Sequence, residues 1–168
     1  TILNYYKRKD LSKMQQQVPY QAPDFALMDS QGQLRKLADF AGRWLVIYFY
    51  PKDNTPGCTA QACSIRDEER ALLDLGVTVI GISADSMTAL ENFASRQDLN
   101  FPLASDPEKE VLTTWGAFGE KKNYGRVFQG IIRSTVVLDP SGTVTHALYN
   151  VKATGHVARL RKLLGLDQ

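Results

Sequence analysis

Cysteine and histidine are scarce in this sequence. Only two of each occur among the 168 residues. Two cysteines are too few for the disulfide framework of a small secreted domain, and a tetrahedral zinc site would need every cysteine and histidine in the chain. We therefore expect neither a disulfide scaffold nor a metal site, and the role of the two cysteines becomes the central question.

Long apolar runs and an excess of charge are missing as well. The longest apolar run is the seven residues Trp44–Tyr50, whereas a membrane-spanning helix needs about 20. The net charge is only +2, and the basic residues are scattered, which argues against a nucleic-acid surface. We expect no membrane span, no nucleic-acid partner and a cytoplasmic location. The sequence begins at Thr1 rather than Met, so a removed upstream targeting segment stays open.

The length and composition suit one folded domain. A chain of 168 residues that is 43% hydrophobic and 23% charged has the size and composition of a single globular unit. Residues 1–18 are polar and basic without a sustained apolar period, which predicts a loosely ordered N-terminal extension. Residues 19–168 are predicted to form the domain.

Apolar patterns after residue 19 predict alternating strands and helices. Hairpins are expected at 25–35 and 134–149, buried strands at 44–50 and 77–83, and helices at 56–75, after Asp85 or Ser86, after Asp106-Pro107 and before Gly165. Residues 116–130 are rich in glycine and are predicted to form a loop. This order matches a thioredoxin-like α/β fold, a central mixed β-sheet flanked by helices, with an added N-terminal β-hairpin.

The first cysteine lies at the start of a predicted helix. Thr55 suits the N-cap and Pro56 the first helical position, which places Gly57 and Cys58 in the first turn. Unpaired backbone N–H groups and the helix dipole favour an anion there, and so favour the nucleophilic thiolate. The same N–H groups can hold an oxygen-containing substrate. The alternatives are a small buried packing residue for Cys58 and an inert helix start for Thr55-Pro56.

Cys63 lies five residues after Cys58. On an ideal helix this spacing gives about 7.5 Å of rise and about 140° of rotation, which separates the Cα atoms by roughly 8–9 Å. Disulfides rarely span more than about 7 Å. The two cysteines therefore either do not bond, or bond only when the first helical turns unwind. The second interpretation fits a redox cycle, and the first leaves Cys63 as a packing residue beside Ala62.

These residues resemble the peroxiredoxin family. Pro51, Thr55 and Cys58 reproduce its Pro-x-x-x-Thr-x-x-Cys signature. The longer runs 48–52, 55–59 and 61–63 are similar to the bacterioferritin comigratory protein or peroxiredoxin Q subgroup, as are 81–83, 103–106 and 130–134. The likeness extends from about Pro19 to Leu164, whereas the residues before Pro19 exceed the short start that is usual in this subgroup.

The resemblance implies an antioxidant peroxidase without a metal or organic cofactor. Cys58 would be the peroxidatic cysteine that attacks hydrogen peroxide or an organic hydroperoxide, and Cys63 the resolving cysteine of an intramolecular disulfide. Arg133 and Thr55 would orient the peroxide, and Pro51 would shield the sulfur from water. Thioredoxin or a similar dithiol would recycle the disulfide. Because no partner chain is needed for it, we expect a monomer.

Two other functions fit the same fold. A thiol-disulfide oxidoreductase normally uses Cys-x-x-Cys, whose sulfurs can bond without unwinding the helix, and that motif is missing here. A copper-binding protein would use Cys58, Cys63 and a histidine. Without the family resemblance, we would expect Arg133 to form a surface ion pair.

Overall fold

The computed structural model describes residues 15, 17–153 and 155–165, so most of the predicted extension 1–18 lies outside the described residues. The strands are β1 (Tyr20–Gln21), β2 (Ala26–Met28), β3 (Leu34–Lys36), β4 (Trp44–Phe49), β5 (Val77–Ser83), β6 (Leu103–Ser105), β7 (Phe118–Asn123), β8 (Arg126–Ile131), β9 (Ser134–Leu138) and β10 (Thr143–Leu148). The helices are α2 (Pro56–Asp74), α3 (Met87–Arg96), α4 (Glu110–Thr114), α5 (His156–Leu163) and the 3₁₀ helix η2 (Leu37–Phe40). In this described part, no helix is long and apolar enough to cross a membrane.

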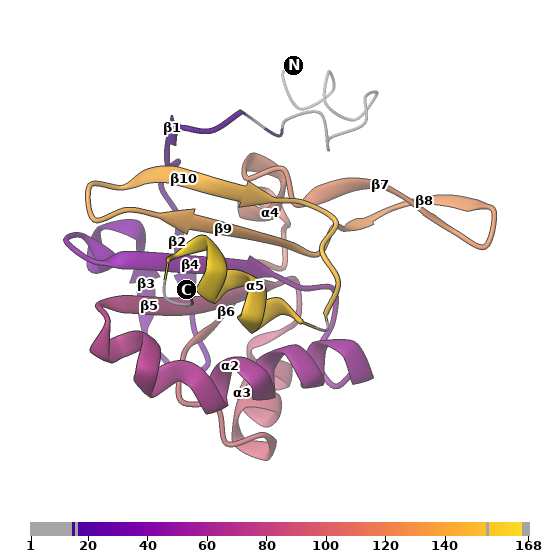
Figure 1. Cartoon of the computed structure of the whole chain (residues 1–168). Helices are drawn as coiled ribbons and strands as arrows, with labels where there is room; N and C mark the ends of the chain where they lie inside the picture. Colours follow the sequence, from indigo (N-terminus) through magenta and orange to yellow (C-terminus); the bar gives the residue numbers. More distant parts are fainter. Residues whose placement is uncertain (1–14, 16, 154, 166–168) are drawn as a thin grey trace.

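A six-stranded mixed sheet forms the centre of the molecule (Figure 1). Its strand order is β1-β10-β9-β4-β5-β6. Strands β4, β5 and β6 are parallel, whereas β9 runs antiparallel to β4, and β10 antiparallel to β9. The residues of β4 from Leu45 to Phe49 are all buried, as the continuous apolar run predicts for a central strand. The predicted mixed sheet with flanking helices and a front hairpin, β2–β3, is confirmed.

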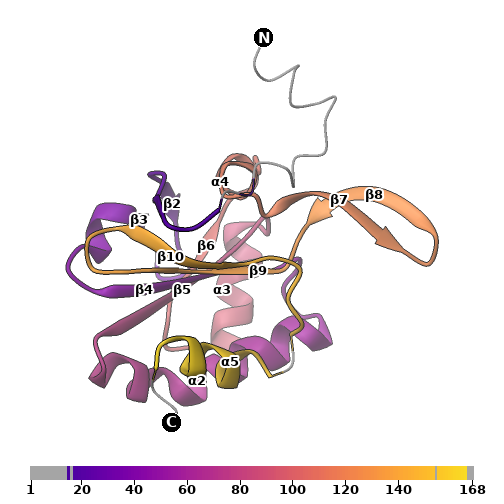
Figure 2. The ribbon, with the colours of Figure 1, turned by 45° about the horizontal axis from the view of Figure 1, so that its top comes forward.

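Alternate residues of β4 belong to two separate hydrophobic clusters, one on each face of the sheet. Leu45, Ile47 and Phe49 pack in a cluster with Ala22 and Phe25, which precede β2, and with α4. Val46 and Tyr48 pack in a cluster with α2, α3 and α5. Figure 2 shows α2 and α5 on one side of the sheet and α4 with the β2–β3 hairpin on the other. The helix that carries both cysteines thus covers the Tyr48 face.

A glycine in β5 makes room for Tyr48. Gly81 lies opposite Tyr48 in the register of β4 and β5. A Cβ atom at Gly81 would lie 2.7 Å from Tyr48 Cζ and 2.8 Å from Leu103 Cδ2, closer than packed carbon atoms approach. The missing side chain therefore lets the Tyr48 ring lie in the same cluster as Cys58.

The prediction of a loop at residues 116–130 is wrong, because most of these residues form the β7–β8 hairpin. Tyr124 and Gly125 at its tip both have positive φ, 51° and 76°, as a tight type I′ turn requires. The sequence carries no clear signal for this turn, because Asn123 and Gly125 are separated by Tyr124 rather than adjacent, and because the two flanking strands are polar. The hairpin projects from the body of the molecule (Figure 1).

The short helix α4 begins later than Asp106-Pro107 predicts. The backbone N–H of Asp106 donates to Ser83 O at 2.8 Å, which holds this residue at the edge of β5. Its carboxylate instead accepts a hydrogen bond from the Leu112 N–H at 2.8 Å. Asp106 thus supports α4 from outside the helix, and Lys109 occupies the N-cap with a φ of 61°.

Candidate active site

The register of the sheet brings Arg133 to the start of α2. Phe49 at the end of β4 pairs with Ser134 at the start of β9. Because these strands are antiparallel, the residue before Ser134 and the segment after Phe49 meet at the same edge of the sheet. Arg133 and the turn that leads into α2 are therefore neighbours, although Cys58 and Arg133 are 75 positions apart.

The guanidinium of Arg133 contacts the sulfur of Cys58 directly. Arg133 Nη2 donates to Cys58 Sγ at 3.1 Å, and Nη1 donates to Gln61 Oε1. Gln61 is fully buried and lies one turn after Cys58 on α2. A Cβ atom at Gly57 would come to 3.5 Å from Arg133 Nη2, so the guanidinium passes close over the helix start. Cys58 itself is only 2% exposed.

Gln61 is a site residue that the sequence reasoning missed. It is a polar residue on the buried face of α2, beside Ala62 and Ile65. A buried polar side chain needs a partner, and the partner of its Oε1 atom is Arg133. A polar residue three positions after Cys58, on the apolar side of the helix, was the available signal.

The helix start has the predicted positions but a different role for Thr55. Pro56 is the first residue of α2 and Thr55 its N-cap. The first bond of the helix is from Thr59 N–H to Thr55 O at 2.9 Å, so the N–H groups of Gly57 and Cys58 have no acceptor within the helix. The expected capping by the Thr55 side chain does not occur. Its hydroxyl donates to Lys52 O at 2.9 Å instead.

Two stacked tyrosines lie on the same face of the sheet as Cys58. The rings of Tyr48 and Tyr50 stack with centroids 5.4 Å apart. Burial raises the pKa of Tyr48 well above its ordinary value, and the charge of nearby Cys58 raises it further. Tyr48 therefore remains a neutral phenol beside the sulfur.

The second tyrosine is tied to a buried acid in the turn before α2. Tyr50 OH donates to Asp53 Oδ1 at 2.7 Å, and the backbone N–H of Asp53 donates to Asp85 Oδ2 at 2.9 Å. Burial first, and then the charge of Asp85, raise the pKa of Asp53 from 3.8 to about 7. Its Oδ2 atom has no hydrogen-bond partner among the described residues, and a proton on this atom would supply a donor toward Asp85.

Asp53→Asn should change how the stability of the fold depends on pH. A carboxyl whose folded-state pKa is raised binds a proton more tightly when folded, so the contribution of Asp53 to wild-type stability falls as the pH rises from about 4 to about 7. Asparagine removes this loss. We expect the free energy of unfolding of Asp53→Asn, relative to wild type, to increase by about 1–2 kcal/mol between pH 5 and pH 8. Urea unfolding at the two pH values measures it.

The control for this measurement is Asp74→Asn, which removes an exposed carboxylate at the end of α2. Its stability relative to wild type should be the same at both pH values. An equally flat difference for Asp53→Asn would show that Asp53 is already ionised at pH 5.

The other two predicted site residues lie around this contact rather than in it. Pro51 is half-buried in the turn between β4 and α2. Cys63 is half-buried farther along α2, and its thiol donates to Gln97 Oε1 at 3.4 Å, at the end of α3. Both cysteines are free thiols. The structure thus brings Cys58 and Arg133 together and holds Cys63 against a different helix.

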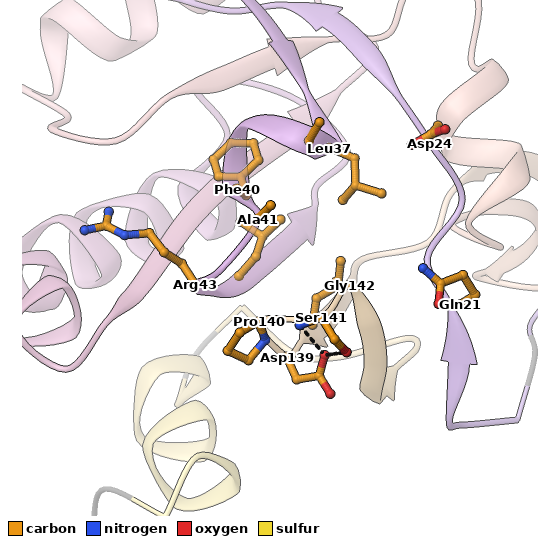
Figure 3. Close-up of a pocket in the computed structure, with 13 residues that line it drawn as sticks. Gln21, Asp24, Leu37, Phe40, Ala41, Arg43, Asp139, Pro140, Ser141 and Gly142 are labelled. Atoms are coloured by element: carbon orange, nitrogen blue, oxygen red, sulfur yellow. Dashed lines mark hydrogen bonds between the residues drawn. The ribbon is translucent and has the colours of Figure 1, made fainter.

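A separate cavity of about 160 Å³ lies at the opposite edge of the sheet (Figure 3). It is lined by Leu45 near the start of β4 and by Leu138 at the end of β9, together with η2 and the β9–β10 turn. The Asp139 carboxylate there accepts bonds from Ser141 within the turn. No cysteine lines this cavity. Among the described residues, no group of three or more His, Cys, Asp and Glu side chains is placed to hold a metal ion.

A class of thiol-dependent enzymes is defined by a thioredoxin-like fold in which a buried cysteine at the start of a helix accepts a hydrogen bond from an arginine. A family model described as the AhpC/TSA family matches residues 18–147. Peroxiredoxin Bcp of Escherichia coli (strain K12) is 42% identical over 135 residues, which cover 80% of this chain and 86% of that protein. A Mycobacterium tuberculosis (strain H37Rv) relative with a peroxiredoxin name is 52% identical over 145 residues, 86% of this chain and 92% of the relative.

Solved structures agree with these relatives. The bacterioferritin comigratory protein of Xanthomonas campestris has a TM-score of 0.79 at 37% identity, covering 84% of this chain and 90% of that one. PrxQ of Xylella fastidiosa has a TM-score of 0.80 at 29% identity, covering 89% and 98%. The chain belongs to the AhpC/TSA family, as a peroxiredoxin of the bacterioferritin comigratory protein or peroxiredoxin Q subgroup. It is a thiol-dependent peroxidase, which decides against the thiol-disulfide oxidoreductase and copper-binding alternatives.

Proposed function

We propose that this peroxiredoxin reduces hydrogen peroxide and organic hydroperoxides at Cys58, resolves the product with Cys63, and is recycled by thioredoxin or a similar dithiol. The observation that carries the proposal is the 3.1 Å hydrogen bond from Arg133 to Cys58 Sγ at the start of α2. A guanidinium in this position stabilises the thiolate and can also donate to a peroxide oxygen.

In the first step the Cys58 thiolate attacks one oxygen of the O–O bond. A new S–O bond forms, the O–O bond breaks, and the leaving oxygen takes a proton and departs as water or an alcohol. The sulfur is oxidised to a sulfenic acid and the peroxide is reduced. The free N–H groups of Gly57 and Cys58 and the Arg133 guanidinium supply donors for the charge that develops on oxygen.

Thr55 and Pro51 have supporting roles in this proposal. The Thr55 hydroxyl donates its hydrogen to Lys52 O, so its oxygen can still accept a hydrogen bond from the O–H group of a hydroperoxide. This contact would orient the peroxide for attack along the O–O axis. Pro51, half-buried in the same turn, would limit the access of water to the sulfur.

In the second step Cys63 attacks the sulfenic sulfur. The thiol loses its proton, a disulfide forms, and the sulfenic oxygen leaves as water. A dithiol such as thioredoxin then reduces the disulfide through a mixed disulfide and is itself oxidised. Both cysteines come from one chain, so a monomer is sufficient. The solved Xanthomonas campestris relative is described by its alkyl peroxide reduction activity, which supports organic hydroperoxides as substrates here.

The proposal is tested by titrating the reduced protein with one equivalent of hydrogen peroxide and counting thiols. We expect rapid loss of both thiols in each chain, with no covalent dimer on a non-reducing gel. Cys58→Ser should retain the Cys63 thiol for at least 10²-fold longer, roughly as a free thiol does. Loss of thiols from wild type as slow as from Cys58→Ser would overturn the assignment of Cys58.

A further inference from the structure

Arg66 lies about one turn after Cys63 on α2 and contacts the same residue at the end of α3. Residues three positions apart lie on the same face of a helix. Arg66 Nη1 donates to the backbone oxygen of Gln97 at 2.6 Å, while the Cys63 thiol donates to the Oε1 atom of the same residue at 3.4 Å. Arg66 and Cys63 are both half-buried. They are therefore held side by side against the end of α3.

The Gln97 side chain binds Cys63 in its protonated form. An amide oxygen only accepts hydrogen bonds, so it suits the S–H group and repels a sulfur that has lost its proton. The thiolate, however, is the form that attacks another sulfur, and an ordinary thiol is mostly protonated at neutral pH. Cys63 must therefore leave Gln97 and lose its proton before it reacts, and a nearby cation would stabilise the charge that forms.

Arg66 and Cys63 also interact through their charges. A hydrogen bond with Asp67 raises the pKa of Arg66, and the negative charge of a Cys63 thiolate raises it further, against an opposing effect of burial. The interaction between two charges is reciprocal. The Arg66 guanidinium therefore attracts the anionic form of Cys63.

Arg66 is anchored beyond the part of α2 that has to open. Asn100 Nδ2 donates to Arg66 O at 3.3 Å, and the preceding residue, Ile65, is only 1% exposed and packs in the hydrophobic cluster of the Tyr48 face. These contacts lie after Cys63 in the helix, so an opening confined to residues 58–63 leaves them intact. Arg66 thus stays next to Cys63 when the thiol is released.

We propose that Arg66 is a positioning residue of the resolving step, and that its guanidinium stabilises the Cys63 thiolate that forms after the thiol leaves Gln97. An electron pair of the thiolate forms the S–S bond, the S–O bond of the Cys58 sulfenic acid breaks, and the departing hydroxide takes a proton to become water. This inference rests on the proposed role of Cys63 as the resolving residue, and it adds the cation that assists that residue.

The test follows the loss of the second thiol after reduced protein is mixed with hydrogen peroxide at several concentrations. Thiols are counted in acid-quenched samples over a range of pH, and the step that does not depend on peroxide concentration is the resolving step. Its rate in wild type should rise with pH, and Arg66→Met should move the midpoint of this rise upward by about 0.5–1 unit. At pH 6 the variant should resolve about two- to fourfold more slowly, because the greater nucleophilicity of a more basic thiolate offsets about half of the lost thiolate on a logarithmic scale.

A merely structural role for Arg66 predicts a different result. Gln97 is the C-cap of α3, and a cation there stabilises the end of the helix. Loss of that contact alone would change the resolving rate by the same factor at every pH. The proposal instead predicts that Arg66→Met is no slower than wild type at high pH, where the thiol is ionised in both proteins.

Two further variants complete the test. Arg66→Lys keeps a cation but loses the planar guanidinium that bridges Asp67 and Gln97, and its midpoint should stay close to that of wild type. Arg70→Met removes an exposed arginine one turn farther along α2 and should leave the pH profile unchanged. The first oxidation should proceed at the wild-type rate in every variant.

Three results would overturn the inference: an unchanged midpoint in Arg66→Met, a midpoint in Arg66→Lys that shifts as far as in Arg66→Met, or a resolving rate in wild type that does not depend on pH. Failure of the proposed function gives another pattern. In that case wild type forms no intramolecular disulfide at any pH, whereas failure of the inference alone leaves a disulfide that forms normally.

Discussion

Arg133→Met should slow the oxidation of Cys58 by hydrogen peroxide by about 10²- to 10³-fold. The reason is the direct contact, because Arg133 Nη2 lies 3.1 Å from Cys58 Sγ. Methionine removes both the positive charge that stabilises the thiolate and the donor that would follow the charge onto the peroxide oxygen. Stopped-flow measurement of the first oxidation step, at a fixed pH and with reduced protein, isolates this effect from resolution and recycling.

Two further variants separate the charge from its geometry. Arg133→Lys keeps a cation but loses the planar fork that reaches Cys58 and Gln61 together, so we expect a rate between wild type and Arg133→Met. Arg159→Met removes an exposed arginine from α5 and should not change the rate. Because Arg133→Met leaves the buried Gln61 oxygen without its donor, the midpoint of thermal unfolding should be measured alongside. A normal rate in a folded Arg133→Met variant would remove Arg133 from the reaction.

The sheet and the position of Cys58 followed from the sequence because local chemistry determines both. The run from Trp44 to Tyr50 is apolar on both faces, which suits only a central strand, and Thr55-Pro56 marks a helix start by backbone preference alone. Both features were found where predicted. They are properties of a few adjacent residues and do not depend on distant contacts.

The contact between Arg133 and Cys58 is a different kind of feature. It depends on the antiparallel register that sets Phe49 opposite Ser134, and no local pattern reports which strand pairs with which. Only the family resemblance pointed to Arg133. Gln61 escaped notice for the same reason, because its partner Arg133 is 72 positions away. The β7–β8 hairpin was missed because its polar strands lack the apolar alternation of a half-buried sheet.

Cys63→Ser should separate the two steps of the catalytic cycle. The first oxidation of Cys58 should proceed at the wild-type rate, because the Cys63 thiol is hydrogen-bonded to Gln97 rather than to the Cys58 sulfur. Turnover with thioredoxin should fall by about 10²-fold or more, since an intramolecular thiol reacts at a much higher effective concentration than a separate dithiol. A coupled assay of thioredoxin oxidation measures turnover, and a sulfenic-acid probe should label Cys58 in this variant but not in wild type. Unchanged turnover would show that Cys63 is not the resolving residue.

The proposed resolving step would require α2 to open, and the structure shows which contacts would have to break. Cys58 has to leave its bond with Arg133, Cys63 its bond with Gln97, and Gln61 and Ala62 between them are buried. Once the sulfur carries an oxygen it no longer has the thiolate charge that the guanidinium stabilises, so oxidation itself weakens one of these restraints. Wild type should therefore show faster amide hydrogen exchange at residues 57–63 in the disulfide form than in the reduced form, while Cys63→Ser with Cys58 oxidised lies between them. Equal exchange in the two wild-type forms would mean that the disulfide forms without unwinding of the helix.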